Sequence, residues 1–296
     1  MPNAISAPSS SPALVTLSNK VVLAARPAMT KFMDFVTDFS ADFVAPGSTL
    51  KIAVNSGTKA GAFDSSTNNY ATGKESISFA SVTLTHFVDS ETFTDAQLLE
   101  VPESVFSKAA AGCARGIQLA MADAVDTAIQ NLNTTATSLE VPHDGSLSKA
   151  DIAALAGATK NDAARCVLVL NRAYWAKAIA LFDADVYGGA EAIRQGRLDG
   201  GVFGWKAIQW STKVPTSAVG VIIPEDALAV VARAVPCNKA GYIDYKLEAD
   251  EETGLAIGFR QGFTQETGTN FIAAETAFGA AFADANNCEK VVVAAS

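Results

Sequence analysis

The residues best suited to acid–base or metal chemistry are few. The sequence has only two histidines, His86 and His143. Their separation does not give two ligands to one metal ion. His86 falls on the apolar phase of a strand pattern, which predicts a hydrogen-bonded, half-buried imidazole, and His143 lies in the turn-like stretch VPHDGS. We therefore expect no metal site and no catalytic histidine.

Carboxylates and glycines form no recognisable site either. Asp183 and Asp185 could be a carboxylate pair, but an EF-hand-like loop needs further ligands and a closing acidic residue, where Arg194 stands instead. The acidic run at 250–252 is typical of an exposed hairpin tip. GGVFG at 200–204 lacks the dinucleotide-binding spacing, and neither a P-loop nor a G-x-S-x-G motif occurs. The sequence predicts no cofactor and no enzyme.

The cysteines are widely spaced and form no C-x-x-C pair. Neither a zinc site nor a disulfide scaffold is expected from this spacing. We expect buried, idle thiols in a reducing cytosol. They are Cys113, Cys166, Cys237 and Cys288.

The composition limits the classes of protein to which this chain can belong. The 296 residues are 49% hydrophobic, enough for a substantial core, and the formal net charge is -9. An acidic balance argues against a surface that grips nucleic-acid phosphates. Neither a signal peptide nor a membrane-spanning run is expected. Residues 1–30, rich in Ser, Ala and Pro, predict an extended arm that needs a partner surface.

Two predicted strands flank a long polar loop. TLKIAVNS (49–56) and SISFASVTLTHFVD (76–89) are strand-like, with Val82, Leu84, His86 and Val88 alternating. The loop at 57–75 is longer than connections inside compact domains usually are. Two interpretations of this loop remain: a flexible hairpin, or a loop that contacts another molecule. For the second case, the candidate contact residues are Lys59, Phe63, Tyr70 and Lys74.

A single long helix is predicted over residues 102–133. Pro102 precedes it, and small or medium apolar residues recur at intervals of three and four. At 1.5 Å per residue it extends about 45 Å, farther than the core of a compact domain requires. It is typical of a structural beam.

An α/β region follows, and then a hairpin. The apolar patterns predict helices at 151–159, 172–182 and 225–235. They predict strands at 165–171, 204–211 and 218–224, a hairpin at 242–263 and a last strand at 289–295. Arg194 and Arg197 are candidates for pairing with carboxylates of a neighbouring subunit, although ordinary surface charge explains them equally.

The order of these parts resembles a tailed-bacteriophage major capsid protein. ARCVLVLNRAYWAKAIALF resembles that family's strand and helix near the capsomer axis. GGVFGWKAIQWSTKVP, with Gly204, Trp205 and the closing Val214-Pro215, resembles the family's turn, strand and valine-proline end, and AVGVIIPEDALAVVARAV and GLAIGFRQGF continue the series. The resemblance extends from about residue 30 onward.

This resemblance implies an α+β phage major capsid fold of the Hong Kong phage type, shared with encapsulins. The parts it implies are an N-terminal arm at 1–30, peripheral-domain strands at 31–56, an extended loop at 57–75, a peripheral domain at 76–145 with the spine helix 102–133, an axial domain at 146–240, and at 241–296 an axial-domain hairpin returning to C-terminal peripheral-domain strands.

The implied function is structural. The resemblance implies a virion capsid protein, made in the host bacterial cytoplasm, that assembles into hexamers and pentamers of an icosahedral shell around double-stranded DNA. The implied partners are neighbouring capsomers, a separate scaffolding protein and a portal, with weak DNA contact and no membrane. Some members are crosslinked through a loop lysine. Lys59 and Lys74 are available here, but the matching asparagine and glutamate are not found, so we expect no crosslink.

Two other hypotheses about the function remain. An encapsulin-like compartment shell has the same implied fold and holds protein cargo. An α/β enzyme with an unrecognised site predicts a small oligomer with a deep polar pocket.

Overall fold

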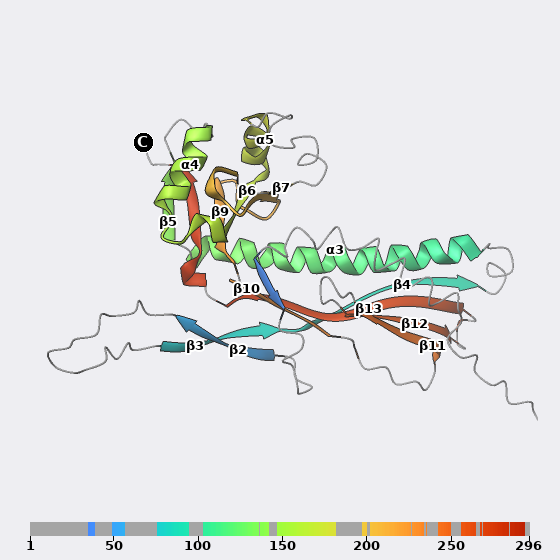
Figure 1. Cartoon of the computed structure of the whole chain (residues 1–296). Helices are drawn as coiled ribbons and strands as arrows, with labels where there is room; N and C mark the ends of the chain where they lie inside the picture. The colour runs from blue at the N-terminus through green and yellow to red at the C-terminus, as the bar shows by residue number, and fades with distance from the viewer. Residues whose placement is uncertain are drawn as a thin grey trace, which may run out of the picture.

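The structure is a computed structural model with two connected parts, an elongated one and a smaller one at its end (Figure 1). The described residues are 35–38, 49–56, 76–94, 103–135, 137–141, 147–181, 197–199, 202–225, 227–233, 235, 242–249, 256–264, 267, 269–283 and 285–293. Within them the chain forms two six-stranded sheets and a separate two-stranded ribbon. No helix in these ranges is long and apolar enough to cross a bilayer.

The first sheet is built around one long central strand, β13. Its strands run in the order β1 (Val36–Asp38), β10 (Leu228–Arg233), β13 (Thr269–Phe282), β12 (Ala256–Thr264) and β11 (Tyr242–Ala249), and β4 (Thr85–Thr94) pairs with the other edge of β13. At Ala277 and Phe278, β13 pairs with β10 on one side and β4 on the other. β10 and β4 therefore lie on opposite edges of this strand.

The helix α3 (Glu103–Thr135) runs along this sheet (Figure 1). Its buried stripe includes Ile117, Met121 and Ile129, which belong to one core with Phe259 and Phe278 of the sheet. Because buried apolar residues recur every three or four positions, the helix gains its stability mainly from this packing.

The second sheet is sandwiched between helices. Its order is β5 (Thr137–Val141), β14 (Glu289–Val293), β9 (Gly220–Pro224), β6 (Cys166–Asn171), β8 (Ala207–Ser211) and β7 (Arg197–Asp199). In β6, Val167 and Val169 join the core of α3, whereas Leu168 and Leu170 join a second core with α4 (Lys149–Ala158) and α5 (Arg172–Leu181). One face of the sheet therefore rests on α3 and the other on the two short helices.

Local signals fix several element ends. Ser148 caps α4, since its hydroxyl accepts from the Asp151 amide at 3.1 Å while the Asp151 carboxylate accepts from the Ser148 amide at 2.7 Å.

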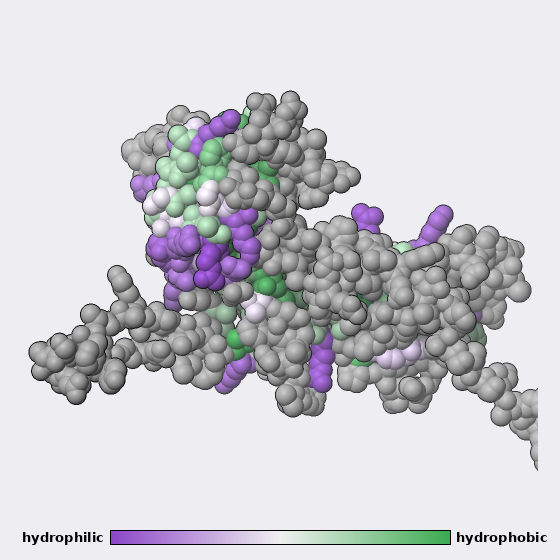
Figure 2. Space-filling view, in the orientation of Figure 1, coloured by the Kyte–Doolittle hydropathy of each residue, from purple (hydrophilic) through white to green (hydrophobic). Residues whose placement is uncertain are grey.

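Three short 3₁₀ turns lie in the described connections between these elements: η2 (Ala163–Arg165), η3 (Val202–Gly204) and η4 (Ala285–Asn287). Figure 2 shows hydrophilic surface on the α4/α5 part, on its side nearer the first sheet.

The ribbon consists of β2 (Thr49–Ser56) and β3 (Ser76–Thr83), paired antiparallel from end to end. Ile52 and Val82 are buried and pack against Ala229 and Val231 of β10. The base of the ribbon is thereby attached to the first sheet.

Most predicted elements are confirmed. The strands at 49–56 and 76–89, the long helix, the helices at 151–159 and 172–182 and the hairpin at 242–263 all appear, as do the strands at 165–171, 204–211, 218–224 and 289–295, with ends shifted by a few residues.

The predicted helix at 225–235 is wrong, because 228–233 forms β10. A short apolar run fits a buried strand as well as a helix. The β-branched Val230 and Val231 favour the strand, which lies buried between β1 and β13. Glu225, expected in a first helical turn, instead pairs with Lys206 at 3.1 Å and Arg165 at 3.4 Å.

The predicted alternation across 76–89 is also wrong in part. The strand breaks at Leu84, and Phe87 rather than Val88 then packs against the main core, so Val88 is 53% exposed. The break changes which phase of the strand faces inward.

The expected grouping of the C-terminal elements differs from the structure. The hairpin β11–β12, predicted with the axial domain, pairs with β13 in the sheet that carries α3. The last strand, β14, predicted with the peripheral domain, lies in the second sheet between β5 and β9. The domain boundaries themselves stay predictions.

Candidate assembly surface and buried ion cluster

The predicted contact residues lie mostly outside the described residues. This holds for Lys59, Phe63, Tyr70, Lys74 and Arg194. The backbone of Arg197 opens β7, where its Cα is paired with Gln209 in the neighbouring strand. The role of these residues at a subunit interface therefore stays a prediction.

The described part of the loop region is its ribbon, and close backbone packing holds the ribbon base. A Cβ added to Gly279 of β13 would overlap the Thr83 carbonyl oxygen and lie 2.8 Å from a methyl carbon of Val82. β3 can cross β13 here only because Gly279 has no side chain. The ribbon therefore leaves the first sheet at a fixed point.

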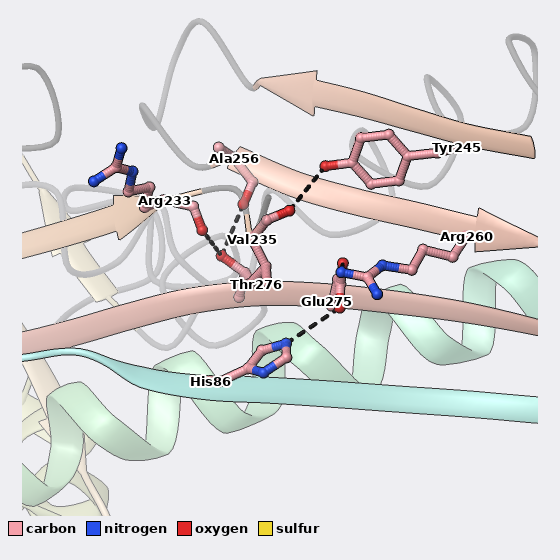
Figure 3. A network of polar contacts seen from close by, with 8 residues as sticks. All are labelled: His86, Arg233, Val235, Tyr245, Ala256, Arg260, Glu275 and Thr276. Carbon is pink, nitrogen blue, oxygen red and sulfur yellow. Dashed lines mark hydrogen bonds and ion pairs between the residues drawn. The ribbon is translucent and has the colours of Figure 1, made fainter. Parts of the chain in front are cut away.

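A buried carboxylate lies at the centre of the first sheet. Glu275 of β13 forms an ion pair with Arg260 of β12, and its Oε2 lies 3.2 Å from Nε2 of His86 on β4 (Figure 3). The Glu275 side chain is only 3% exposed, and that of Arg260 14%. A charge buried this deeply is stable only when it is paired, so the cluster ties β4 and β12 to β13.

Tyr245 extends this cluster to the edge strand β11. Its hydroxyl donates to the Val235 carbonyl oxygen at 3.2 Å, and its ring lies 6.0 Å from the Arg260 guanidinium carbon (Figure 3). A Cβ on Gly258 would lie 3.2 Å from this ring and 3.4 Å from Glu275. One row of side chains thus connects four neighbouring strands.

The prediction for His86 is confirmed in its main point, since the imidazole is hydrogen-bonded and 48% exposed. Its partner was not foreseen. Glu275 lies in the alanine-rich TNFIAAETAFGAAF, where a single carboxylate among apolar residues was the only available signal.

Two polar contacts join α3 to the second sheet. The Ser211 hydroxyl donates to the buried Asp126 carboxylate at 2.7 Å, and the Lys213 ammonium lies 3.0 Å from Asp123. Both acceptors are on α3, whereas one donor is the last residue of β8 and the other lies two residues beyond it. These contacts therefore fix the second sheet on the C-terminal half of the helix.

Residues 202–205 (VFGW) form a tight turn into β8. Phe203 and Gly204 have positive φ angles of 53° and 88°, and the left-handed region favours glycine. The buried Trp205 donates from Nε1 to the Ile152 carbonyl oxygen at 3.1 Å. The turn thereby anchors α4 on the second sheet.

The thiols that the structure describes are buried, as predicted: Cys113, Cys166 and Cys288. Burial raises the pKa of Cys113 to about 11, and the nearby Asp89 and Glu91 charges act in the same direction. Burial likewise raises the pKa of Cys166 to about 11, with Glu289 adding to it. Neither thiol is set up as a nucleophile.

The remaining candidates for chemistry fall outside the described residues: His143, Asp183, Asp185, Cys237 and 250–252. Among the side chains that are described, no cluster of three or more His, Cys, Asp or Glu is arranged to hold a metal ion.

Comparison with known proteins gives matches of structure. No protein-family model and no curated protein sequence matches this chain. A chain from the capsid of the native GTA particle is 12% identical with a TM-score of 0.55, and 91% of each chain is covered. The empty GTA capsid gives 13% identity and a TM-score of 0.55 over 91% of this chain and 90% of the other.

A third likeness is to a virus. The capsid structure of the Cyanophage P-SCSP1u gives 13% identity and a TM-score of 0.50 over 88% of this chain and 86% of that one. At such low identity a likeness speaks to the fold. Because it extends over most of both chains in each case, this chain has the α+β fold of phage capsid proteins, the Hong Kong phage type capsid fold.

Proposed function

We propose that this chain is the major capsid protein of a tailed double-stranded DNA bacteriophage, with a structural and not a catalytic role. It assembles into hexamers and pentamers of an icosahedral shell, is made in the host bacterial cytoplasm and ends in the virion. The observation that carries this proposal is the likeness to chains of capsids over 91% and 88% of this chain.

The ribbon supports the proposal. A two-stranded hairpin is marginally stable in water on its own. In β2 and β3 the described buried side chains, Ile52 and Val82, lie at the attached end. The rest of the ribbon and the segment 57–75 therefore gain most by packing against a neighbouring subunit, where Lys59, Phe63, Tyr70 and Lys74 make contacts.

The sheet and helix support it as well. The 33-residue α3 joins both sheets in one core, and the Glu275 cluster adds ionic ties across the first sheet. Because one helix packs against both sheets, the subunit is held together along its length, which fits a structural role. Neighbouring capsomers, a separate scaffolding protein, a portal and weakly held DNA complete the proposed set of partners.

The experiment is purification of the chain after expression in bacteria, followed by electron microscopy and analysis of contents after nuclease treatment. Closed shells, with DNA when the phage packaging proteins are present, support the proposal. Shells filled with one protein cargo favour the encapsulin-like alternative. A small oligomer with enzymatic turnover contradicts both.

A further inference from the structure

The chain passes between the two sheets three times. α3 leads from the first sheet into β5, the β9–β10 connection leads back, and the β13–β14 connection leads to the second sheet again. The last two connections lie side by side, because the Ala283 amide donates to the Ala227 carbonyl oxygen at 2.9 Å. Any turning of the smaller part relative to the elongated part must therefore be taken up by these two short connections.

One short segment contacts the β13–β14 connection. Residues 159–165, which run from the end of α4 to the start of β6, are called the brace. Lys160 Nζ donates to the Asn286 carbonyl oxygen at 2.5 Å, and Asn161 Nδ2 donates to that of Asn287 at 2.8 Å. Both acceptors are backbone atoms of η4, so these two side chains hold the path of the connection itself.

The brace also contacts the β9–β10 connection. The Glu225 amide donates to the Arg165 carbonyl oxygen at 2.7 Å, and Arg165 Nε lies 3.4 Å from the Glu225 carboxylate. The Lys206 ammonium lies 3.1 Å from the other oxygen of this carboxylate. The brace thus holds both connections, one at each of its ends.

A buried carboxylate anchors the brace on the second sheet. Glu289, the first residue of β14, is 4% exposed. It accepts a hydrogen bond from the Thr159 hydroxyl and another from the Lys160 amide at 3.3 Å. Because a buried carboxylate is costly without donors, these bonds favour one fixed position of the brace.

The outer contacts of the brace are open to solvent. Lys160, Asn286 and Asn287 are exposed, and the Arg165 side chain is 68% exposed. Exposed polar contacts each contribute little free energy, because water competes for the same groups. The brace can therefore release the connections without disrupting a core.

Apolar packing of the second sheet on α3 tolerates small turns. Val167 and Val169 of β6 belong to the core of α3, and apolar contact is non-directional. The hydrogen bonds of the brace and the bond from Ser211 to Asp126 are directional by contrast. Ser211 pairs with Asn171, the last residue of β6, whereas the brace ends where β6 begins. These two sets of contacts lie at opposite ends of the second sheet and together hold its orientation.

We propose that the brace sets the angle between the elongated and the smaller part of the subunit, and that its release lets the smaller part turn slightly about the β9–β10 and β13–β14 connections. The inference rests on the proposed function for its consequence. A shell of hexamers and pentamers puts the same chain into two different surroundings, and the brace restricts the subunit to angles that close into shells of one size.

The test compares the unchanged chain with Lys160→Ala/Asn161→Ala, which removes both side chains from the β13–β14 connection. Lys149→Ala, which removes an exposed lysine from the start of α4, is the control. Glu225→Gln is an independent variant, because it removes both ion pairs from the β9–β10 connection. Hydrogen exchange of the Ala283 amide in unassembled subunits measures opening of the connections, and electron microscopy measures the diameters of the shells.

We expect the double variant and Glu225→Gln to speed exchange of the Ala283 amide several-fold without changing β6 or α3, because the opening is local. Their shells should vary in diameter, whereas shells of the Lys149→Ala control match those of the unchanged chain. Unchanged exchange at Ala283, an equal rise throughout β6 and α3, or shells of uniform diameter overturns the inference and leaves the proposed function standing. Absence of closed shells from the unchanged chain overturns the proposed function, while the exchange result still decides whether the brace holds the connections.

Discussion

The Oε2 atom of Glu275 lies 3.2 Å from Nε2 of His86, although 189 residues separate the two in sequence. Together with Arg260, this contact makes a buried carboxylate the junction of β4, β13 and β12. The first sheet is thus held by charge as well as by backbone pairing, and the cost of removing that charge can be measured.

Glu275→Gln should lower the free energy of unfolding by about 3 kcal/mol, because it leaves the nearly buried Arg260 without its counter-charge. Urea denaturation of unassembled subunits measures this. Glu91→Gln removes an exposed carboxylate from the neighbouring β4 and should change stability by less than about 0.5 kcal/mol. Equal effects of the two substitutions would show that the cluster is not a stabilising tie.

Ser211→Ala should cost about 1–3 kcal/mol, since the buried Asp126 loses a donor on which the contact between α3 and β8 depends. Thr127→Ala is the matched control, because that exposed hydroxyl bonds only to the Asp123 carbonyl of its own helix. Chemical denaturation followed by circular dichroism compares them. A loss of stability no larger than that of the control would show that the Ser211–Asp126 contact does not help to hold the second sheet on α3.

Gly279→Ala should destabilise the subunit and reduce shell assembly, because the added Cβ overlaps the Thr83 carbonyl and pushes the ribbon off the sheet. Gly112→Ala on the exposed side of α3 meets no atom within 4 Å and should stabilise by about 1 kcal/mol through helix propensity. Melting temperature and particle yield report both effects. Normal assembly of Gly279→Ala would mean that the ribbon base is free to move.

The buried thiols should make stability fall at high pH. Burial raises the pKa of Cys113 and Cys166 from 9.0 to about 11, so both stay protonated in the folded state while the unfolded thiols ionise first. Their contribution is therefore complete below pH 9 and is lost as the pH rises toward 11. The double variant Cys113→Ala/Cys166→Ala should show a shallower fall in the free energy of unfolding over that window. An identical pH profile for the two proteins would contradict the raised pKa values of Cys113 and Cys166.

The sequence was most informative where periodicity is long or composition is distinctive. The helix around Ile117 and Met121 repeats over many turns, and the apolar CVLVLN of β6 stands between clear helical patterns, so both were predictable. The polar stretch after Ser56 separated the two ribbon strands for the same reason.

Features that depend on pairing between residues far apart in sequence could not be predicted from local patterns. β10 was mistaken for a helix because its partners, β1 and β13, lie far away in sequence. The alanine-rich β13 gave no strand pattern, and the Glu275 cluster became visible only once Arg260 and His86 were brought beside it. The change of phase at Leu84 likewise depends on where β3 crosses β13, which no local pattern encodes.

The central claim is that this subunit is completed by its neighbours in a closed wall, and electron microscopy of the assembled protein tests it most directly. The account predicts closed shells built of hexamers and pentamers, with the ribbon β2–β3 and the segment 57–75 lying against an adjacent subunit. A stable monomer or small open oligomer, with that segment packed on its own subunit, would contradict it.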